Sequence, residues 1–267
     1  AFERQQLVVQ QLRAGVEQLM SAPGITLVRG TATFVDANTV RVGGDTITAK
    51  NVIIATGSKA KMLPLPDIDD PRVVTSTELL QQSVQPKKLC IIGAGVIGME
   101  FASVFQRFGS EVTVIEYLKE CLPMLDSDVA KRLRKLLEKR GITFRMKTAV
   151  QSLADIDADV ILMATGRQAN TTGLNLEAAG ITLAPNGIIP VDDNFGCLGR
   201  DSGAVLSGLY AIGDVNGRQM LAHAAEMQGR HVVNQILGRE DNIRFDVMRR
   251  PSSLNQRLLV WGQAKTY

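Results

Sequence analysis

The fold that this sequence predicts is decided by one stretch, Leu89-Cys90-Ile91-Ile92-Gly93-Ala94-Gly95-Val96-Ile97-Gly98. Its first four residues are apolar and predict a buried strand. The GxGxxG pattern that follows opens an amphipathic segment, which predicts a helix over 96–108. A glycine turn between a strand and a helix presents free N–H groups and the positive end of the helix to phosphate groups. The stretch therefore predicts a βα unit that binds a dinucleotide.

Each glycine of the pattern has its own steric reason. Gly93 permits the tight turn, Gly95 lacks the Cβ that would hold a pyrophosphate away, and Gly98 lets the helix pack against its strand. We expect the whole loop to hold the dinucleotide, so that the candidate binding residues are Gly93, Ala94, Gly95, Val96, Ile97 and Gly98. The alternative is a Gly-rich turn in an α/β sheet that has no ligand.

An acidic residue follows at the distance that the pattern requires. A second predicted strand, 111–115, ends in Glu116, which lies 23 residues after Gly93. At this place a carboxylate accepts hydrogen bonds from both hydroxyls of the adenosine ribose and repels a 2′-phosphate. No arginine occurs in 117–121, so the sequence predicts NAD as the ligand in preference to NADP.

Outward from this unit, predicted strands and helices alternate. Strands are expected over 89–92, 111–115, 142–146 and 160–165, and helices over 96–108 and 127–140. This alternation implies right-handed crossovers and a parallel sheet, hence an α/β fold.

The flanking regions have different patterns. Residues 3–20 predict an amphipathic helix, and 51–57 predict a buried strand that leads into a linker over 58–70. Between them, the sequence predicts an antiparallel meander of three or four short strands, over 25–29, 32–35, 39–42 and 46–49. After the alternating region we expect strands over 187–193 and 209–212 and a helix over 219–237, whereas 251–261 fits neither period.

Two of the predicted strands end in the same way. Residues 53–57 and 162–166 both finish in an apolar residue followed by Ala-Thr-Gly. A glycine at the end of each strand suggests a junction where two stretches of backbone pass closely. We therefore predict two related sheets that deliver the chain to such a junction.

The composition of the 267 residues, 45% hydrophobic and 21% charged, is ordinary for a globular protein of one or two domains. The net charge of +3 arises in residues 249–267, which hold four basic residues and no acid, so we expect no nucleic-acid partner. No apolar run approaches the roughly 18 residues of a membrane helix, and no membrane partner is expected. Three cysteines without close spacing favour a reducing, cytoplasmic location, and two histidines leave no metal site to predict.

These motifs resemble those of the pyridine nucleotide–disulfide oxidoreductases, and among them most closely the dihydrolipoamide dehydrogenases. The resemblance covers residues 1 to about 248 and is carried by the segments 52–58, 91–100, 113–116, 164–170, 210–214 and 220–223. It implies a complete Rossmann-like NAD domain, a parallel sheet plus a small antiparallel meander, with an incomplete FAD/NAD(P)-binding domain around it.

The resemblance also divides the chain. Residues 1–57 would be the C-terminal part of the first FAD-domain segment, 58–166 the NAD-binding domain, and 167–248 a central segment that returns to the FAD domain. Residues 249–267 would be a basic tail without family character, standing where the family's interface domain is expected. We expect a chain truncated at both ends relative to the family.

Further cofactor contacts follow from the resemblance. Asp214 would hold a ribityl hydroxyl of FAD, the helix over 220–237 would aim its N-terminus at the flavin, and Glu100 would lie where nicotinamide meets flavin. The residues assigned in this way are Ala55, Thr56, Gly57, Glu100, Gly166, Gly213, Asp214, Met220, Leu221, Ala222 and His223. Without the resemblance, Asp214 is expected to cap a helix or turn, and Glu100 to interact with the helix dipole. His223 is then expected to be a solvated or core histidine.

The resemblance implies a parent activity in which NAD oxidises dihydrolipoamide through FAD and a redox disulfide. It also implies a homodimer and a partner complex of lipoamide-bearing acyltransferases. This sequence has no pair of cysteines separated by four residues, no His-Pro base and no second GxGxxG loop for FAD. We therefore assign no catalytic residue, expect the chain to be inactive alone, and regard FAD binding as doubtful. The alternatives are a non-catalytic NAD-binding module, or another FAD/NAD-linked disulfide reductase or NADH oxidase-like relative.

Overall fold

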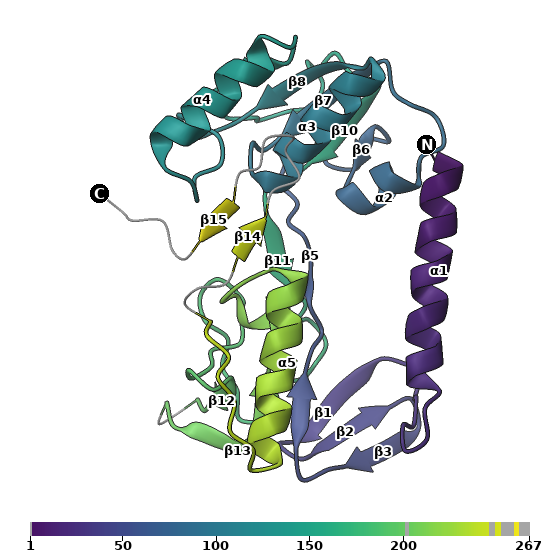
Figure 1. Cartoon of the computed structure of the whole chain (residues 1–267), viewed down its shortest axis with the longest axis vertical. Coiled ribbons are helices and arrows are strands. Elements are labelled where there is room, and N and C mark those ends of the chain that lie inside the picture. Colours follow the sequence, from purple (N-terminus) through teal and green to yellow (C-terminus); the bar gives the residue numbers. More distant parts are fainter. Residues whose placement is uncertain (1, 201–202, 246–248, 252–258, 262–267) are drawn as a thin grey trace.

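The computed structural model describes residues 2–200, 203–245, 249–251 and 259–261. Two lobes are joined by a narrow two-stranded ribbon, and the first helix runs along one side from lobe to lobe (Figure 1). The alternating part of the sequence forms the upper lobe, and the flanking regions form the lower lobe.

The upper lobe contains the predicted parallel sheet. Its order is β6-β10-β7-β8-β9, and every neighbouring pair is parallel. The strands are β6 (Val73–Val74), β7 (Lys88–Ile92), β8 (Glu111–Ile115), β9 (Thr143–Arg145) and β10 (Val160–Met163), and the helices are α2 (Ser76–Gln81), α3 (Val96–Phe108) and α4 (Ser127–Glu138). The alternation therefore predicted the parallel sheet correctly, whereas the short elements β6 and α2 were not predicted.

The burial of β7 explains why its sequence is a continuous apolar run that predicts a strand. Leu89, Cys90, Ile91 and Ile92 of β7 are all at most 4% exposed, because the sheet has helices and loops on both faces. Each fully buried leucine or isoleucine contributes about 1.5–3 kcal/mol. The end of α3 is equally well marked, since Gly109 adopts the left-handed conformation (φ 97°) that closes a helix.

The lower lobe contains two small sheets and one long helix. The predicted antiparallel meander is formed by β1 (Ala32–Asp36), β2 (Thr39–Val42) and β3 (Asp45–Thr48). A second sheet has the order β12-β13-β4, with β4 (Val52–Ile54), β12 (Gly196–Leu198) and β13 (Val205–Ala211). The 3-10 helix η1 (Gly213–Asn216) and α5 (Ala222–Ile236) follow β13, and Gln228 of α5 accepts a hydrogen bond from the Gly213 amide (2.7 Å).

The ribbon between the lobes explains the repeated Ala-Thr-Gly. Its strands, β5 (Ser58–Ala60) and β11 (Arg167–Ala169), pair antiparallel, and each begins just after one copy of the repeat. Thr56 Oγ1 donates to Asn170 O and Thr165 Oγ1 donates to Lys61 O, both at 2.7 Å, so each threonine fastens one end of the ribbon. The predicted junction is confirmed.

Three expectations for the lower lobe were wrong. Residues 25–29 form no strand, because none of the described strands pairs with their backbone, and Ile25, Leu27 and Val28 are 43–54% exposed. The strand expected over 187–193 is reduced to a single bridge between Val191 and Cys197. The helix expected from residue 219 begins at Ala222, since Leu221 is its extended N-cap (ψ 134°).

Two further segments have more regular structure than expected. The linker predicted over 58–70 opens with β5, which pairs with β11. In the tail, β14 (Arg249–Pro251) and β15 (Leu259–Trp261) pair antiparallel, although the sequence there fits neither period.

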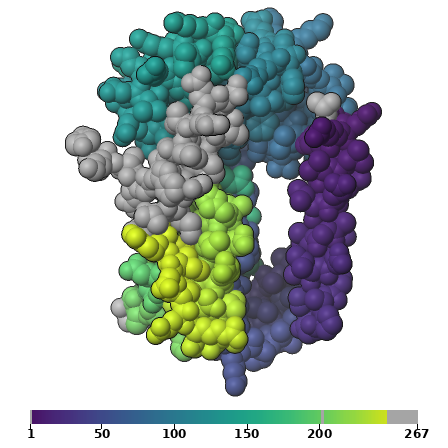
Figure 2. All heavy atoms as spheres, in the orientation of Figure 1, coloured from purple at the N-terminus to yellow at the C-terminus, as the bar shows by residue number. Residues whose placement is uncertain are grey.

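Helix α1 (Phe2–Met20) has no buried residue. Its apolar stripe is open to solvent, with Leu7, Leu12 and Leu19 61–67% exposed, and open space separates the helix from the ribbon (Figure 2). At the upper lobe, Gln5 Nε2 donates to Leu80 O (3.0 Å). Across the described residues, no helix combines the length and the apolar character needed to cross a membrane.

Candidate functional site

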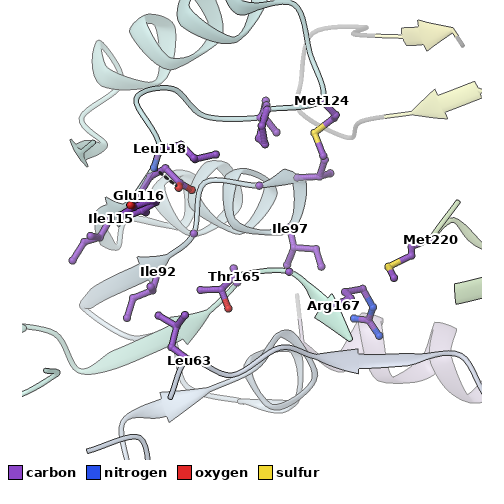
Figure 3. A pocket seen from close by; sticks show the side chains of 18 of the residues that line it. Leu63, Ile92, Ile97, Ile115, Glu116, Leu118, Met124, Thr165, Arg167 and Met220 are labelled. Carbon is purple, nitrogen blue, oxygen red and sulfur yellow. Dashed lines mark hydrogen bonds between the residues drawn. The ribbon is translucent and has the colours of Figure 1, made fainter. Parts of the chain in front are cut away.

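A pocket of about 830 Å³ lies where the parallel sheet of the upper lobe faces the lower lobe (Figure 3). This volume suits a cofactor-sized molecule. Its wall comes from the segments that follow β7, β8, β9 and β10, and from 218–221 of the lower lobe. The carboxyl ends of parallel strands are the edge at which open α/β sheets bind ligands.

The three glycines of the GxGxxG loop differ in the space that surrounds them. A Cβ on Gly93 (φ 107°) would overlap the Ala164 carbonyl oxygen, and a Cβ on Gly98 would overlap the Gly93 carbonyl oxygen. A Cβ on Gly95 would meet no atom within 4 Å, and Gly95 lines the pocket. Gly93 and Gly98 are thus required by the packing of the protein, whereas the space beside Gly95 is left for a ligand.

The backbone amides of the loop also fall into two groups, those bonded within the protein and those without an acceptor. The Gly93 amide donates to Ile115 O (2.8 Å), and the Ala94 amide donates to Glu116 Oε2 (2.6 Å). The amides of Gly95, Val96 and Ile97 have no acceptor within the described chain, and all three residues line the pocket. They lie at the N-terminus of α3, where the helix dipole favours an anion.

The carboxylate of Glu116 is held by backbone on both oxygens. Besides the Ala94 amide at Oε2, the Leu118 amide donates to Oε1 (2.8 Å). A carboxylate has about four acceptor positions, so Glu116 can accept two further bonds from a ligand. Its side chain lines the pocket at the end formed by Ile115 and Leu118 (Figure 3).

The opposite end of the pocket is formed by both lobes. Arg167 lies there with Met220, on the far side of Ile97 from Glu116 (Figure 3). Arg218, Gln219 and Leu221, the sequence neighbours of Met220, also line the pocket. Met220 and Leu221, assigned to a flavin contact from the sequence, thus line the same pocket as the GxGxxG loop.

The structure brings together about half of the residues predicted for the site. Those that line the pocket are Gly93, Gly95, Val96, Ile97, Glu116, Gly166, Met220 and Leu221. Those outside its wall are Ala55, Thr56, Gly57, Ala94, Gly98, Glu100, Gly213, Asp214, Ala222 and His223. Ala94 and Gly98 are buried beneath the loop, and Asp214 in η1 accepts a hydrogen bond from Ser58 Oγ (2.5 Å).

Several residues of the pocket wall were not predicted from the sequence. Thr148 and Val150 follow β9, and residues 122–125 follow β8. The rule that ligands bind at the carboxyl ends of parallel strands could have found them. Leu63 and Arg218 carry no such signal, because one lies in a linker and the other in a loop of the opposite lobe.

The three cysteines have no part in this pocket. Cys90, Cys121 and Cys197 are unpaired and buried, and burial raises the pKa of their thiols to about 11, about 12 and about 12 respectively. Over the part of the chain that the structure describes, no group of three or more His, Cys, Asp or Glu side chains could hold a metal ion.

We expect the native chain to be unreactive toward a thiol reagent such as dithionitrobenzoate. Because the raised pKa values leave about 0.1% or less of each thiol as thiolate at about pH 8, and because the side chains are buried, attack requires opening of the fold. The measurement is the thiol count with and without denaturant. One thiol reacting rapidly in the native chain would contradict this environment, and three should react after denaturation.

Comparison with known proteins agrees with this geometry. The family model described as pyridine nucleotide-disulphide oxidoreductase matches residues 3–229. The chain is 37% identical to a mitochondrial dihydrolipoyl dehydrogenase of Pisum sativum over an alignment of 262 residues that covers 89% of this chain and 51% of that protein. It is 38% identical to a dihydrolipoyl dehydrogenase of Acholeplasma laidlawii over 250 residues, covering 86% of this chain and 70% of that one.

A solved structure gives the same result. The HOCl-induced flavoprotein disulfide reductase RclA from Escherichia coli superposes with a TM-score of 0.85 at 29% identity, covering 95% of this chain and 61% of that one. The chain thus spans about half the length of the Pisum sativum relative and somewhat more of the solved neighbour. The match of one family model to most of the chain means that this protein belongs to the pyridine nucleotide-disulphide oxidoreductase family.

Proposed function

We propose that this chain binds NAD(H) in the pocket at the carboxyl edge of the parallel sheet. The observation that carries the proposal is the open space beside Gly95, next to the unused amides of Gly95, Val96 and Ile97. Three N–H groups at a helix N-terminus are a cradle for a diphosphate. The position that a Cβ on Gly95 would occupy has no protein atom within 4 Å.

The remaining wall fits the two halves of the dinucleotide. Glu116 would accept the two hydroxyls of the adenosine ribose, with its carboxylate already oriented by two backbone amides. The nicotinamide half would extend past Ile97 toward Arg167 and Met220. When bound, NAD supplies hydride transfer at its nicotinamide ring. The chain itself would bind, orient and shield that ring from water.

Selectivity for NAD over NADP would come from charge. The carboxylate of Glu116 repels a 2′-phosphate, and Tyr117 and Leu118, which continue the wall, carry no positive charge. The neighbouring Lys119 is not part of the wall.

The residues assigned to FAD fit that group only in part. These 267 residues contain one GxGxxG loop, so they supply no second loop of this kind for the diphosphate of a flavin dinucleotide. Among the residues proposed for flavin contact, Met220 and Leu221 line the NAD pocket, whereas those outside it are Ala55, Thr56, Gly57, Glu100, Gly213, Asp214, Ala222 and His223. Oδ2 of Asp214 already accepts a bond from Ser58. We propose that these 267 residues bind flavin only weakly.

We propose the same division of the chain as the sequence indicates: 1–57 and 167–248 for the FAD-type lobe, 58–166 for the NAD domain, and 249–267 as a separate tail. All strands of the parallel sheet lie within 58–166.

The proposed parent activity is oxidation of dihydrolipoamide by NAD, in a cytoplasmic homodimer that serves lipoamide-bearing acyltransferases. The buried, protonated cysteines support no disulfide chemistry of their own, so a non-catalytic NAD-binding module is the second candidate function.

The test is a titration of the chain with NADH and with NADPH, followed by the fluorescence of the reduced nicotinamide. We expect saturable binding of NADH and binding of NADPH that is weaker by about tenfold or more. The same sample is then incubated with FAD and desalted, and flavin absorbance is measured. Retained flavin that NADH reduces would favour the oxidoreductase, whereas a colourless chain that binds NADH would favour the module. Absence of NADH binding would overturn the proposal.

A further inference from the structure

Arg167 connects the ribbon to the lower lobe. From β11, its Nε donates to Ser58 Oγ (2.6 Å) and its Nη2 donates to Ser58 O (2.8 Å). The Ser58 hydroxyl donates in turn to Asp214 Oδ2 (2.5 Å), which lies 3.6 Å from Arg167 Nε. We call Arg167, Ser58 and Asp214 the ribbon clamp. It joins both strands of the ribbon to η1 through charge-assisted hydrogen bonds.

The clamp is separate from the bonds that hold the ribbon together. Thr56 and Thr165 fasten the two ends of the ribbon through backbone carbonyls, and neither bond involves a member of the clamp. The strand pairing itself is backbone pairing. Loss of the clamp should therefore leave the ribbon paired and release the contact between the ribbon and η1.

The segment that follows η1 closes one end of the pocket. Asp214 lies in η1, which ends at Gly217, and residues 218–221 then form part of the pocket wall. Fixing Asp214 against the ribbon thus fixes the starting point of the wall segment. Arg167 lines the pocket, whereas Ser58 and Asp214 do not.

We propose that Arg167 is a positioning residue for the nicotinamide end of the pocket, acting through Ser58 and Asp214 on the segment 218–221. This inference rests on the proposed binding of NAD(H). The clamp would thereby set the distance between the two walls at that end, because Arg167 belongs to the ribbon and Met220 to the lower lobe, and both line the pocket there (Figure 3). The adenosine end lies within the upper lobe and should not depend on the clamp.

Two ligands of different length test this assignment. ADP reaches the amides of Gly95–Ile97 and Glu116 but lacks the nicotinamide half, whereas NADH spans both ends. Affinities for ADP and NADH are measured by calorimetry for the parent chain and for Arg167→Ala and Ser58→Ala. Arg200→Ala is the matched control, since Arg200 also bonds a hydroxyl, Thr182 Oγ1 (3.1 Å), and an acid, Glu177 (3.7 Å), away from the pocket.

We expect the affinity for NADH to fall about fivefold in Arg167→Ala and about threefold in Ser58→Ala, with the affinity for ADP unchanged in both. Arg200→Ala should bind both ligands as the parent chain does. Thermal unfolding verifies that each variant is folded, and Arg167→Lys provides a milder variant if Arg167→Ala is not.

Three outcomes would overturn the assignment. An equal loss for ADP and NADH would mean that the clamp supports the whole fold. A loss in Arg167→Ala without one in Ser58→Ala would mean that Arg167 only touches the ligand. Unchanged NADH binding in both variants would remove any role for the clamp, with the proposed NAD(H) site left standing. Failure of the parent chain to bind either ligand would overturn the proposed function together with this inference.

Discussion

Gly95→Ala should weaken NADH binding by about 10- to 100-fold while leaving the free energy of unfolding unchanged. A Cβ at this position meets no protein atom within 4 Å, and the backbone (φ −73°, ψ −176°) is one that alanine adopts freely. The methyl group would stand where a diphosphate has to approach the amides of Val96 and Ile97. Losing one charge-assisted hydrogen bond costs about 1.5–3 kcal/mol, which sets the size of the effect.

Gly98→Ala is the matched control, because it makes the same chemical change three residues along the same loop. Its Cβ would overlap the Gly93 carbonyl oxygen and lie 3.2 Å from Ile91 Cγ2. Overpacking of this kind costs about 1–3 kcal/mol of stability. Urea unfolding and NADH titration of both variants separate the two roles. Equal destabilisation by the two substitutions, or full NADH affinity in Gly95→Ala, would contradict the assignment of Gly95 to a ligand.

The contrast between these two glycines shows why the upper lobe was predictable. Strand, glycine loop and helix are signalled by local patterns, and α3 and β8 have the bounds that the sequence predicted. The glycines end these elements by conformations that other residues avoid, as at Gly109. Local chemistry alone therefore places Glu116 and the loop at one edge of the sheet.

The rest of the site depends on contacts that no local pattern reveals. Arg167 and Ser58 are 109 residues apart in the sequence, and Ser58 and Asp214 are 156 apart. The meeting of Met220 with the GxGxxG loop likewise requires the two lobes to face each other. The strand predicted over 25–29 is absent for the same reason, because a segment with a strand pattern forms a strand only when it pairs with another strand.

Glu116→Ala is expected to weaken NADH binding by about 1–3 kcal/mol, because the two ribose hydroxyls would lose their acceptor. It should also reduce the preference for NADH over NADPH, since the repulsion of a 2′-phosphate disappears. The substitution has a second effect within the protein. The amides of Ala94 and Leu118 would lose their acceptor, and Ala94 is fully buried, so a loss of about 1–3 kcal/mol in stability should accompany the loss of binding.

Glu116→Gln separates these two effects. Glutamine keeps one carbonyl oxygen as an acceptor for one amide but removes the charge, so we expect most of the stability to return while the discrimination against NADPH stays low. Glu111→Ala is the matched control, because Glu111 is the first residue of the same strand, β8, and thus lies at the end of the strand away from the pocket. Titration with NADH and NADPH gives the selectivity of each variant. A Glu116→Gln chain that still rejects NADPH as the parent chain does would mean that selectivity arises elsewhere in the wall, and the role given to the carboxylate would have to be withdrawn.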